Sequence, residues 1–476
     1  MKKRLFSGIL AFLMMLTLGS CTGNHEHGLS AEEPTTITLW HYYNGALKSA
    51  FDTMVDEFNE TVGKEKGIIV DAFGQGSVND LADAVAASAN KDAGAEELPD
   101  VFATYVDTAL ELDKMDLLAP LDDYLTGEEI AEYVPSYIEE GRLGADGKLK
   151  VFPVAKSTEL LMINKTAFEP FAAAAGVSTD DLSTWEGLAE VAEKYYDYSG
   201  GKAFFGRDAY ANYMIIGSLQ LGTELFKVDK GEVTLQLDKD IMRRLWDNLY
   251  VPYVNGYFSK YGRFATDDAK TGDIIALVGS SSGASYFPTE VSVNDQESEA
   301  IECMVLPVPN FEGTEPYAVQ QGAGMAVVRS DEQHEYASVV FLEWFTEKER
   351  NTEFSLMSAY LPVKQEANDP DLVHSVMEGK QMDISPVVKD SIEVGINQAK
   401  DYTLYTNKAF DNGYNARQIL ENSMLERAQE NRALVLEKIG QGVPHDEAVA
   451  EYLTDEQFEQ WYQELETMLD QTLKAS

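Results

Sequence analysis

Short apolar runs alternate with amphipathic stretches along most of this chain. The runs at residues 37–40, 67–70, 101–103 and 274–278 have the length and composition of buried strands. Apolar side chains recur over residues 51–58 at the spacing of one helix face. Strands that alternate with helices predict an α/β fold with mainly parallel sheets.

The middle of the chain continues this pattern, and its end differs. Further apolar runs predict strands at residues 149–154, 160–163, 304–307 and 325–328. Thr184 is suited to cap a helix that begins at Trp185. From about Ala337 onward, acidic amphipathic segments predict that helix dominates.

The first 21 residues form a pattern of their own. Basic residues 2–4 precede an apolar run over residues 5–18, which ends in Leu18–Cys21. The run is shorter than the roughly 20 residues that span a membrane, so a secretory signal is favoured over a transmembrane anchor. Small residues before Cys21 resemble a bacterial lipoprotein box, in which this cysteine becomes the lipid-bearing N-terminus. Residues 22–36 are polar and predict a flexible tether.

Bulk composition narrows the class of protein. A chain of 476 residues has room for two domains or one large two-lobed unit. Its net charge of -44 disfavours binding to nucleic acid or to anionic lipid. Acylation of Cys21 leaves Cys303 as the only mature thiol, so no internal disulfide is expected. The six histidines are scattered without zinc-type spacing, and we expect neither metal nor cofactor.

Ring side chains follow the first predicted strand directly. Ligands of open α/β sheets bind beyond the carboxyl ends of strands. Trp40, His41, Tyr42 and Tyr43 stand there and could stack on a sugar. Burial of Trp40 in the core is the alternative interpretation.

Three further segments carry groups suited to ligand oxygen atoms. Lys156, Ser157 and Thr158 lie between two predicted strands and would suit a polyol or a phosphate, unless they are an ordinary strand edge. Arg207 lies in a loop rich in glycine and aromatic residues, as the partner of a bound anion or of a structural ion pair. Gly322 would permit a close approach between backbone and ligand.

Residues 279–283 match the G-x-S-x-G pattern of serine hydrolases after an apolar strand. This makes Ser281 a candidate nucleophile and a secreted serine esterase the alternative function. No HGGG-type oxyanion motif is present, and no later histidine has supporting context. We favour a binding role, in which small residues including Ser282 open a helix whose N–H groups bind a ligand oxygen.

Taken together and in this order, the segments resemble the extracellular solute-binding proteins of ABC importers, in the branch of maltodextrin and glycerol-3-phosphate binders. The matching segments are Ile37–His41, Pro99–Val101, Leu117–Asp122, Leu160–Lys165, Thr184–Trp185, Gly272–Ala276, Leu306–Pro307, Gly322–Gly324, Ala337–Thr346 and Tyr360–Val363. The resemblance therefore extends from Ile37 to the C-terminal helices.

The glycerol-3-phosphate binders are similar in their Trp-His, Ser-Thr, serine-rich and Tyr-Leu-Pro motifs. Tyr105 is followed here by Val106 and Asp107, where those proteins carry a glutamate. The arginine that those proteins carry on the phosphate side near the C-terminus has no match that we can place here, and the region holds Asn407 and Lys408 instead. The resemblance thus leaves a sugar, a polyol and a glycerol phosphate open.

The resemblance implies a two-lobed periplasmic-binding-protein-like fold that has a hinge and no catalytic activity. We predict a lipoprotein signal at 1–21, a tether at 22–36, lobe 1 at 35–153 and 306–357, and lobe 2 at 156–303 and 360–476. Crossings between the lobes are expected near Pro153, Leu306 and Leu361. The candidate ligand contacts are Trp40, His41, Tyr42, Tyr43, Tyr105, Lys156, Ser157, Thr158, Arg207, Ser281, Ser282, Gly322 and Tyr360.

The implied partners are a small solute and the permease subunits of an ABC importer. The protein is expected to be a monomer that lies outside the cytoplasm and contacts the membrane only through its lipid. A surface adhesin or structural lipoprotein, which would bind no small ligand, is the third alternative beside the importer protein and the esterase.

Overall fold

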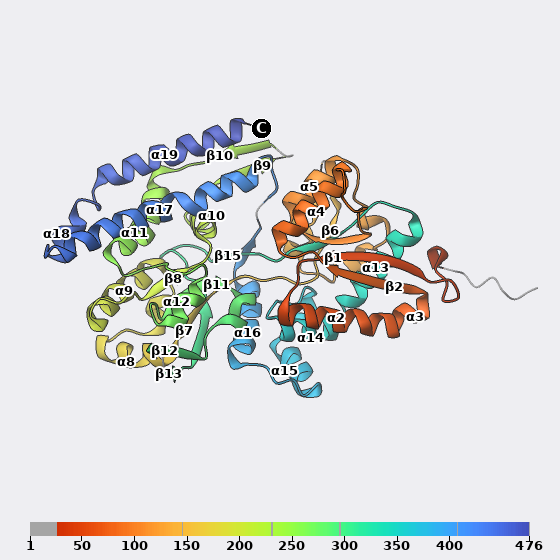
Figure 1. The fold of residues 1–476 in the computed structure, drawn as a ribbon, viewed down its shortest axis with the longest axis horizontal. Helices are drawn as coiled ribbons and strands as arrows, with labels where there is room; N and C mark the ends of the chain where they lie inside the picture. Colours follow the sequence, from red (N-terminus) through yellow and green to blue (C-terminus); the bar gives the residue numbers. More distant parts are fainter. Residues whose placement is uncertain (1–25, 145, 230–231, 295–296, 407, 476) are drawn as a thin grey trace, which may run out of the picture.

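The computed structural model describes residues 26–475 except 145, 230–231, 295–296 and 407. The lipoprotein signal and Cys21 lie outside the described residues. Two lobes lie side by side, each built around its own sheet (Figure 1). Among the residues described, no helix is long and apolar enough to cross a membrane.

The first lobe contains a five-stranded sheet in the order β2-β1-β3-β16-β6. Its strands are β1 (Thr35–His41), β2 (Ile68–Gly74), β3 (Val101–Thr104), β6 (Val151–Phe152) and β16 (Gly324–Val327). A small hairpin joins β4 (Arg142–Leu143) to β5 (Lys148–Leu149). The helices of this lobe are α2 (Gly45–Glu60), α3 (Val62–Lys66), α4 (Val78–Asn90), α5 (Val106–Lys114), α6 (Gly127–Ile130), α7 (Pro135–Glu140), α13 (Glu332–Phe345) and α14 (Lys348–Ser358).

Helix α2 shows how the apolar pattern forms this core. Phe51 and Phe58 lie on its buried face and pack edge to face against Phe341 of α13. Such aromatic pairs add roughly 0.5–1.5 kcal/mol to area burial. The amphipathic pattern over residues 51–58 therefore predicted both the helix and the face that it buries.

The second lobe contains a four-stranded sheet in the order β14-β7-β11-β8. Its strands are β7 (Glu159–Asn164), β8 (Phe205–Arg207), β11 (Ala276–Ser280) and β14 (Cys303–Pro307). Three smaller pairs join β9 (Phe226–Asp229) to β10 (Glu232–Leu235), β12 (Glu290–Asn294) to β13 (Glu297–Ala300), and β15 (Tyr317–Val319) to β17 (Thr403–Tyr405).

The remaining helices are α8 (Lys165–Ala175), α9 (Trp185–Ser199), α10 (Tyr210–Gln220), α11 (Lys239–Asn255), α12 (Ala265–Thr271), α15 (Pro370–Gly379), α16 (Pro386–Asp401), α17 (Gly413–Gly440), α18 (His445–Ala450) and α19 (Asp455–Lys474). They pack on this second sheet, on one another or, for α15, mainly against α14 of the first lobe. Thr184 caps α9, as predicted, by accepting a hydrogen bond from the backbone N–H of Gly187. Short 3-10 turns are η1 (Glu26–Gly28), η2 (Leu121–Asp123), η3 (Thr179–Leu182), η4 (Ser281–Tyr286) and η5 (Gln365–Ala367).

Two sequence-based expectations about the fold were wrong. The sheets are mixed rather than mainly parallel, because β16 runs antiparallel to both β3 and β6 while β7 runs antiparallel to both β11 and β14. Parallel neighbours in a sheet are usually joined by a helical crossover. The chain reaches β7 and β16 directly from the other lobe, so no such crossover sets their direction.

The second error concerns the crossing near Leu306. Leu306 lies in β14 and pairs with Leu161, and the chain stays in the second lobe through Phe311 and Ala318, whose side chains belong to its core. The return to the first lobe comes at residues 320–323, just before β16. An apolar strand at residues 304–307 was evident from sequence, but nothing local indicated which sheet it joins.

The second half of the segment predicted as a flexible tether is packed in part on the first lobe. The ring of His27 packs against that of Tyr336 at 4.0 Å between centroids, and Leu29 is buried. The segment around His27 and Leu29 therefore lies against the first lobe, because the apolar side chain of Leu29 gains from leaving water there.

Candidate functional site

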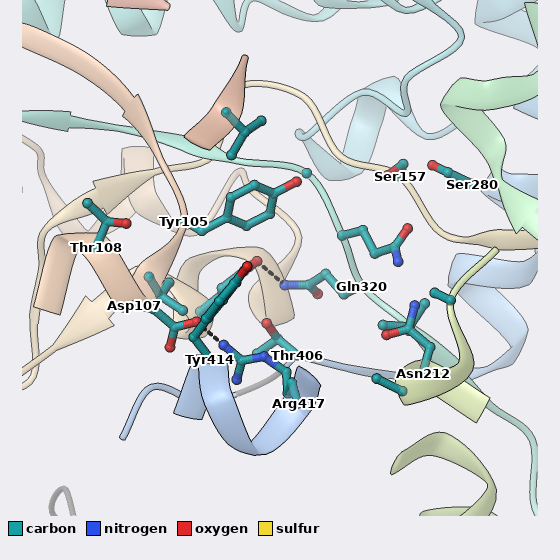
Figure 2. A pocket seen from close by; sticks show the side chains of 18 of the residues that line it. Tyr105, Asp107, Thr108, Ser157, Asn212, Ser280, Gln320, Thr406, Tyr414 and Arg417 are labelled. Carbon is teal, nitrogen blue, oxygen red and sulfur yellow. Dashed lines mark hydrogen bonds and ion pairs between the residues drawn. The ribbon is translucent and has the colours of Figure 1, made fainter. Parts of the chain in front are cut away.

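A cavity of about 920 Å³ lies between the two lobes. The first lobe contributes its wall from α4, α5 and α7, and the second lobe from α10, β11 and α17 (Figure 2). Crossing segments form the rest, since Lys156 pairs with Leu361 and Ser157 with Gln321 in short antiparallel bridges. The cavity therefore lies where the chain passes between lobes.

Three tyrosine rings line this cavity. Tyr105 precedes α5 and is 40% exposed, and Tyr414 in the first turn of α17 is 58% exposed. The hydroxyl group of the half-buried Tyr360 hydrogen-bonds with those of Tyr42 and Ser282. Tyr42 belongs to the first lobe and Ser282 to the second, so Tyr360 connects both walls.

An ion pair crosses the cavity between the lobes. The guanidinium of Arg417 in α17 donates to the carboxylate of Asp107 in α5 (Figure 2). Burial raises the pKa of Asp107, and the charge of Arg417 opposes that rise. Arg417 is the one basic side chain among the described residues that line the cavity.

A second ion pair lies at the floor beside the crossing segments. The ammonium of Lys156, 3% exposed, donates to the carboxylate of Glu140 and to the carbonyl oxygen of Gly322 at 2.8 Å. The side-chain amide of Gln320 also donates to Glu140. Glu140 lines the cavity, whereas Lys156 lies behind it.

Five predicted contacts line this cavity. They are Tyr105, Ser157, Ser282, Gly322 and Tyr360. Gly322 has φ +100°, and a Cβ there would lie 2.7 Å from the carbonyl oxygen of Ala155. The close approach that required glycine is therefore to the neighbouring crossing segment. That any of these residues contacts the solute stays a prediction.

The ring cluster after the first strand lies behind the cavity wall. Trp40, His41 and Tyr43 are buried, and Tyr42 reaches the site only through its bond to Tyr360. The Nδ1 atom of His41 accepts from the backbone N–H of Tyr43. Burial, with a smaller effect of Lys48, lowers the pKa of His41 to about 4. Trp40, His41 and Tyr43 belong to the core and Tyr42 packs against it, because β1 is an inner strand of the first sheet, between β2 and β3.

Lys156, Thr158, Arg207 and Ser281 are also not among the residues that line the cavity. Thr158 donates from Oγ1 to the carbonyl oxygen of Val319, and Arg207 pairs with a buried carboxylate. These polar groups have hydrogen-bond partners within the protein. The cavity lining gives no support to the prediction that they contact the solute, and that prediction stays untested.

Ser281 does not have the environment of a nucleophile. Its side chain is fully buried, and its Oγ accepts from the backbone N–H of Thr158 at 3.3 Å. Each histidine in the described part of the chain has its bonds elsewhere, to Tyr43, Glu332, Asp331, Glu393 or Asn255. The described residues also contain no cluster of three groups able to hold a metal ion.

Sequence reasoning missed several lining residues. They are Asn79, Asp83, Asp107, Asn212, Gln320, Thr406, Tyr414, Arg417 and Glu421. Tyr414 and Arg417 stand one helical turn apart in a segment of mixed charge, since residues 413–440 carry four acidic and four basic side chains. No sequence pattern distinguishes Tyr414 and Arg417 from other helix residues, because only the fold of the second lobe brings them opposite α5.

Comparison with known proteins identifies the family. A family model described as bacterial extracellular solute-binding protein matches residues 53–378. The chain belongs to this family. Among curated proteins, the sn-glycerol-3-phosphate-binding periplasmic protein UgpB of Shigella dysenteriae serotype 1 is 24% identical over 356 residues, which cover 71% of this chain and 77% of that protein.

Solved structures show the same two-lobed fold. The cyclic alpha-maltosyl-1,6-maltose binding protein of Arthrobacter globiformis superposes with a TM-score of 0.66 at 20% identity, over 93% of this chain and all of that one. UgpB of Mycobacterium tuberculosis in complex with glycerophosphocholine gives 0.64 at 18% identity, over 92% and 99%. The predicted fold and the predicted resemblance are thus confirmed.

This solute-binding protein serves an ABC importer and acts outside the cytoplasm. Members of the family are binding proteins that interact with permease components. The esterase alternative has no support from the buried Ser281 or from the family.

Proposed function

We propose that this protein captures a small, uncharged carbohydrate or polyol in the cavity between its lobes. The lobes would close about the crossing segments and present the solute to the permease. The observation that carries this choice of ligand is the charge of the cavity. Among the residues that the structure describes, four carboxylates line it, at Asp83, Asp107, Glu140 and Glu421, against the one guanidinium of Arg417.

That surplus of negative charge disfavours a phosphate ligand. Arg417 is already paired with Asp107, and Lys156 with Glu140, so no described basic group lining the cavity is left for an anion. An anion that loses its water without a counter-charge is strongly disfavoured. A neutral polyol instead gains hydrogen bonds from carboxylate and amide oxygens.

The rings and hydroxyl groups of the cavity suit such a solute. Tyr105, Tyr360 and Tyr414 offer flat apolar faces to the C–H faces of a sugar ring. Ser157 and Ser282 add hydroxyl groups at the crossing and on the second lobe. Relatives provide both chemistries, since one solved neighbour binds a cyclic maltosyl sugar and the curated relative binds glycerol 3-phosphate. The negative charge of the cavity favours the sugar over the phosphate.

A thermal-shift screen tests the ligand class. Maltose, maltotriose and mannotriose form the neutral set, and sn-glycerol 3-phosphate and glycerophosphocholine form the phosphate set. A solute at 100 times its dissociation constant adds about 2.7 kcal/mol to the free energy of unfolding. Stabilisation only by the phosphate set would contradict the proposal, and stabilisation by neither set would favour the adhesin alternative.

Two variants then test the binding residues. For the solute that the screen finds, Tyr360→Ala and Ser157→Ala should each weaken binding about tenfold or more in calorimetry, because each removes a group that lines the cavity. Tyr198→Ala is the matched control, since this exposed ring lies outside the cavity lining. Unchanged affinity in both variants would remove these residues from the site.

We also propose that Cys21 carries the lipid anchor and that the protein acts as a monomer. Two acyl chains give stable anchoring where one alone is marginal. Globomycin should leave unprocessed precursor in the cell. Full release of the wild-type protein into the medium, with no difference between it and Cys21→Ser, would contradict the anchor.

A further inference from the structure

Three side chains of the second lobe form a buried chain of hydrogen bonds that ends at the cavity. The guanidinium of Arg207, at the end of β8, donates to Oε2 of Glu159 at 3.0 Å. The amide nitrogen Nδ2 of Asn212, in the first turn of α10, donates to Oε1 of the same carboxylate at 2.9 Å. The exposed fractions of Arg207, Glu159 and Asn212 are 1%, 4% and 8%, and of the three only Asn212 lines the cavity.

The far end of this chain is fixed firmly. Arg207 donates from Nε to the carbonyl oxygen of Ala209 at 3.0 Å. Its guanidinium lies 5.4 Å from the ring of Trp185 and 5.3 Å from that of Tyr213, within the range of cation–π attraction. The position of Glu159 is thereby determined by a group that cannot lose its proton.

Hydrogen-bond polarity then determines how Asn212 is oriented. Burial raises the pKa of Glu159, but the charge of Arg207 at 3.0 Å opposes that rise, and we take the paired carboxylate as ionised. Arg207 only donates, and an ionised carboxylate only accepts. Glu159 therefore accepts from both neighbours, and Asn212 must direct Nδ2 toward it. The carbonyl oxygen Oδ1 is the atom left for the cavity, where Figure 2 shows the Asn212 side chain.

We propose that Arg207 and Glu159 are positioning residues that hold the amide of Asn212 so that its Oδ1 accepts a hydrogen bond from a hydroxyl group of the solute. Tight binding then requires that the solute carry a hydrogen-bond donor at the position that faces Asn212. This inference rests on the proposed capture of a neutral polyol, and it assigns to that solute one hydroxyl group that the second lobe recognises.

The substitution Glu159→Gln makes a specific test because it should reverse the orientation of Asn212. Arg207 still requires an acceptor, so the amide introduced at position 159 must turn its oxygen toward Arg207 and its NH₂ group toward Asn212. Asn212 must then turn Oδ1 toward that NH₂ group and present Nδ2 to the cavity. Glu335→Gln is the matched control, since Glu335 is also buried and hydrogen-bonded but lies in the first lobe away from the cavity.

The first measurement needs no solute. NMR follows the hydrogen exchange of the side-chain amide of Asn212, whose signal is assigned because it disappears in Asn212→Ser. In the wild type the Nδ2 proton bonded to Glu159 should exchange slowly. Exchange should be at least tenfold faster in Glu159→Gln and unchanged in Glu335→Gln. Equal rates in the wild type and in Glu159→Gln would overturn the positioning role whatever the protein binds.

The second measurement uses calorimetry with monodeoxyfluoro analogues of whichever of maltose, maltotriose or mannotriose binds. Fluorine replaces a donor with a weak acceptor. One analogue should bind the wild type about tenfold less tightly than the parent sugar and bind Glu159→Gln with a clearly smaller loss. If every analogue loses the same affinity relative to the parent sugar in both proteins, Asn212 does not accept a hydrogen bond from a hydroxyl group of the solute. Binding of no sugar overturns the proposed function and this specificity role, while the exchange result still decides the orientation of Asn212.

Discussion

Two buried ion pairs, Lys156 with Glu140 and Arg207 with Glu159, lie close to the cavity and serve different purposes. Lys156 also donates to the carbonyl oxygen of Gly322, so its pair ties two crossing segments to α7 of the first lobe. Arg207 pairs within the sheet of the second lobe, and the same carboxylate accepts from Asn212. The first pair holds the connection between lobes, and the second orients a wall of the cavity.

The contrast shows why a basic residue near a cavity does not indicate an anion site. In both pairs a glutamate neutralises the base, and neither Lys156 nor Arg207 lines the cavity. A buried charge requires a partner of opposite sign. Once that partner is internal, the base is no longer available to a solute.

Removal of Arg207 should have the largest effect on stability. Arg207→Met leaves Glu159 buried without its counter-charge, which typically costs about 3–5 kcal/mol of unfolding free energy. Urea denaturation measures the loss. The double variant Arg207→Met with Glu159→Leu should recover most of it, and a double variant no more stable than the single one would show that the charge is not the cause.

A third buried base, His41, shows what happens without a counter-charge. Burial lowers its pKa to about 4, below its ordinary value of about 6.5. The unfolded chain therefore binds more protons as pH falls from about 6.5 to about 4, and stability is lost over that window, by about 3 kcal/mol in total. Above pH 6.5 this residue adds no pH dependence.

Urea denaturation at pH 7.5 and pH 5 checks the His41 prediction. The wild type should lose about 2 kcal/mol more than His41→Asn between these two pH values. Asparagine keeps an acceptor for the backbone N–H of Tyr43 without titrating. Equal pH dependence in the two proteins would contradict the burial of a neutral imidazole.

Lys156→Met should lower the free energy of unfolding by about 1.5 kcal/mol, which is less than the loss expected for Arg207→Met. Glu140 keeps the amide of Gln320 as a donor and borders the cavity, where water reaches it. Small-angle scattering should also detect a wider range of lobe separations, because the tie between Gly322 and α7 is lost. A loss as large as that of Arg207→Met would remove the distinction between the two pairs.

The pair between Asp107 and Arg417 should contribute least. Its side chains are 31% and 16% exposed, so water screens their attraction. Asp107→Asn should change the free energy of unfolding by about 1 kcal/mol or less, as measured by urea denaturation. A loss of several kcal/mol would mean that this interlobe pair behaves as a buried one.

Local pattern predicted much of the fold. The run at 37–40 became β1, the stripe at 51–58 became α2, and Thr184 caps α9 as its position suggested. The destination of β14 could not be predicted, because one apolar strand fits either sheet. Pairing across lobes is decided by the whole chain, and no local periodicity encodes it.

The site was predicted less well, for a physical reason. Tyr360 and Gly322 stand in motifs that resemble the family, and both line the cavity. Lys156 and Arg207 looked available because sequence does not show that Glu140 and Glu159 fold against them. Arg417 escaped notice because its partner Asp107 lies in the other lobe, 310 residues away along the chain.

Calorimetry of one neutral sugar against one phosphate tests the central claim most directly. The better of maltose and maltotriose, and sn-glycerol 3-phosphate, would each be titrated into the protein at low and at physiological salt. The account predicts that the sugar binds with an affinity that does not depend on salt and that the phosphate binds at least a hundredfold more weakly. Tight binding of glycerol 3-phosphate would contradict it, because the acidic lining around the paired Arg417 would then have to hold an anion.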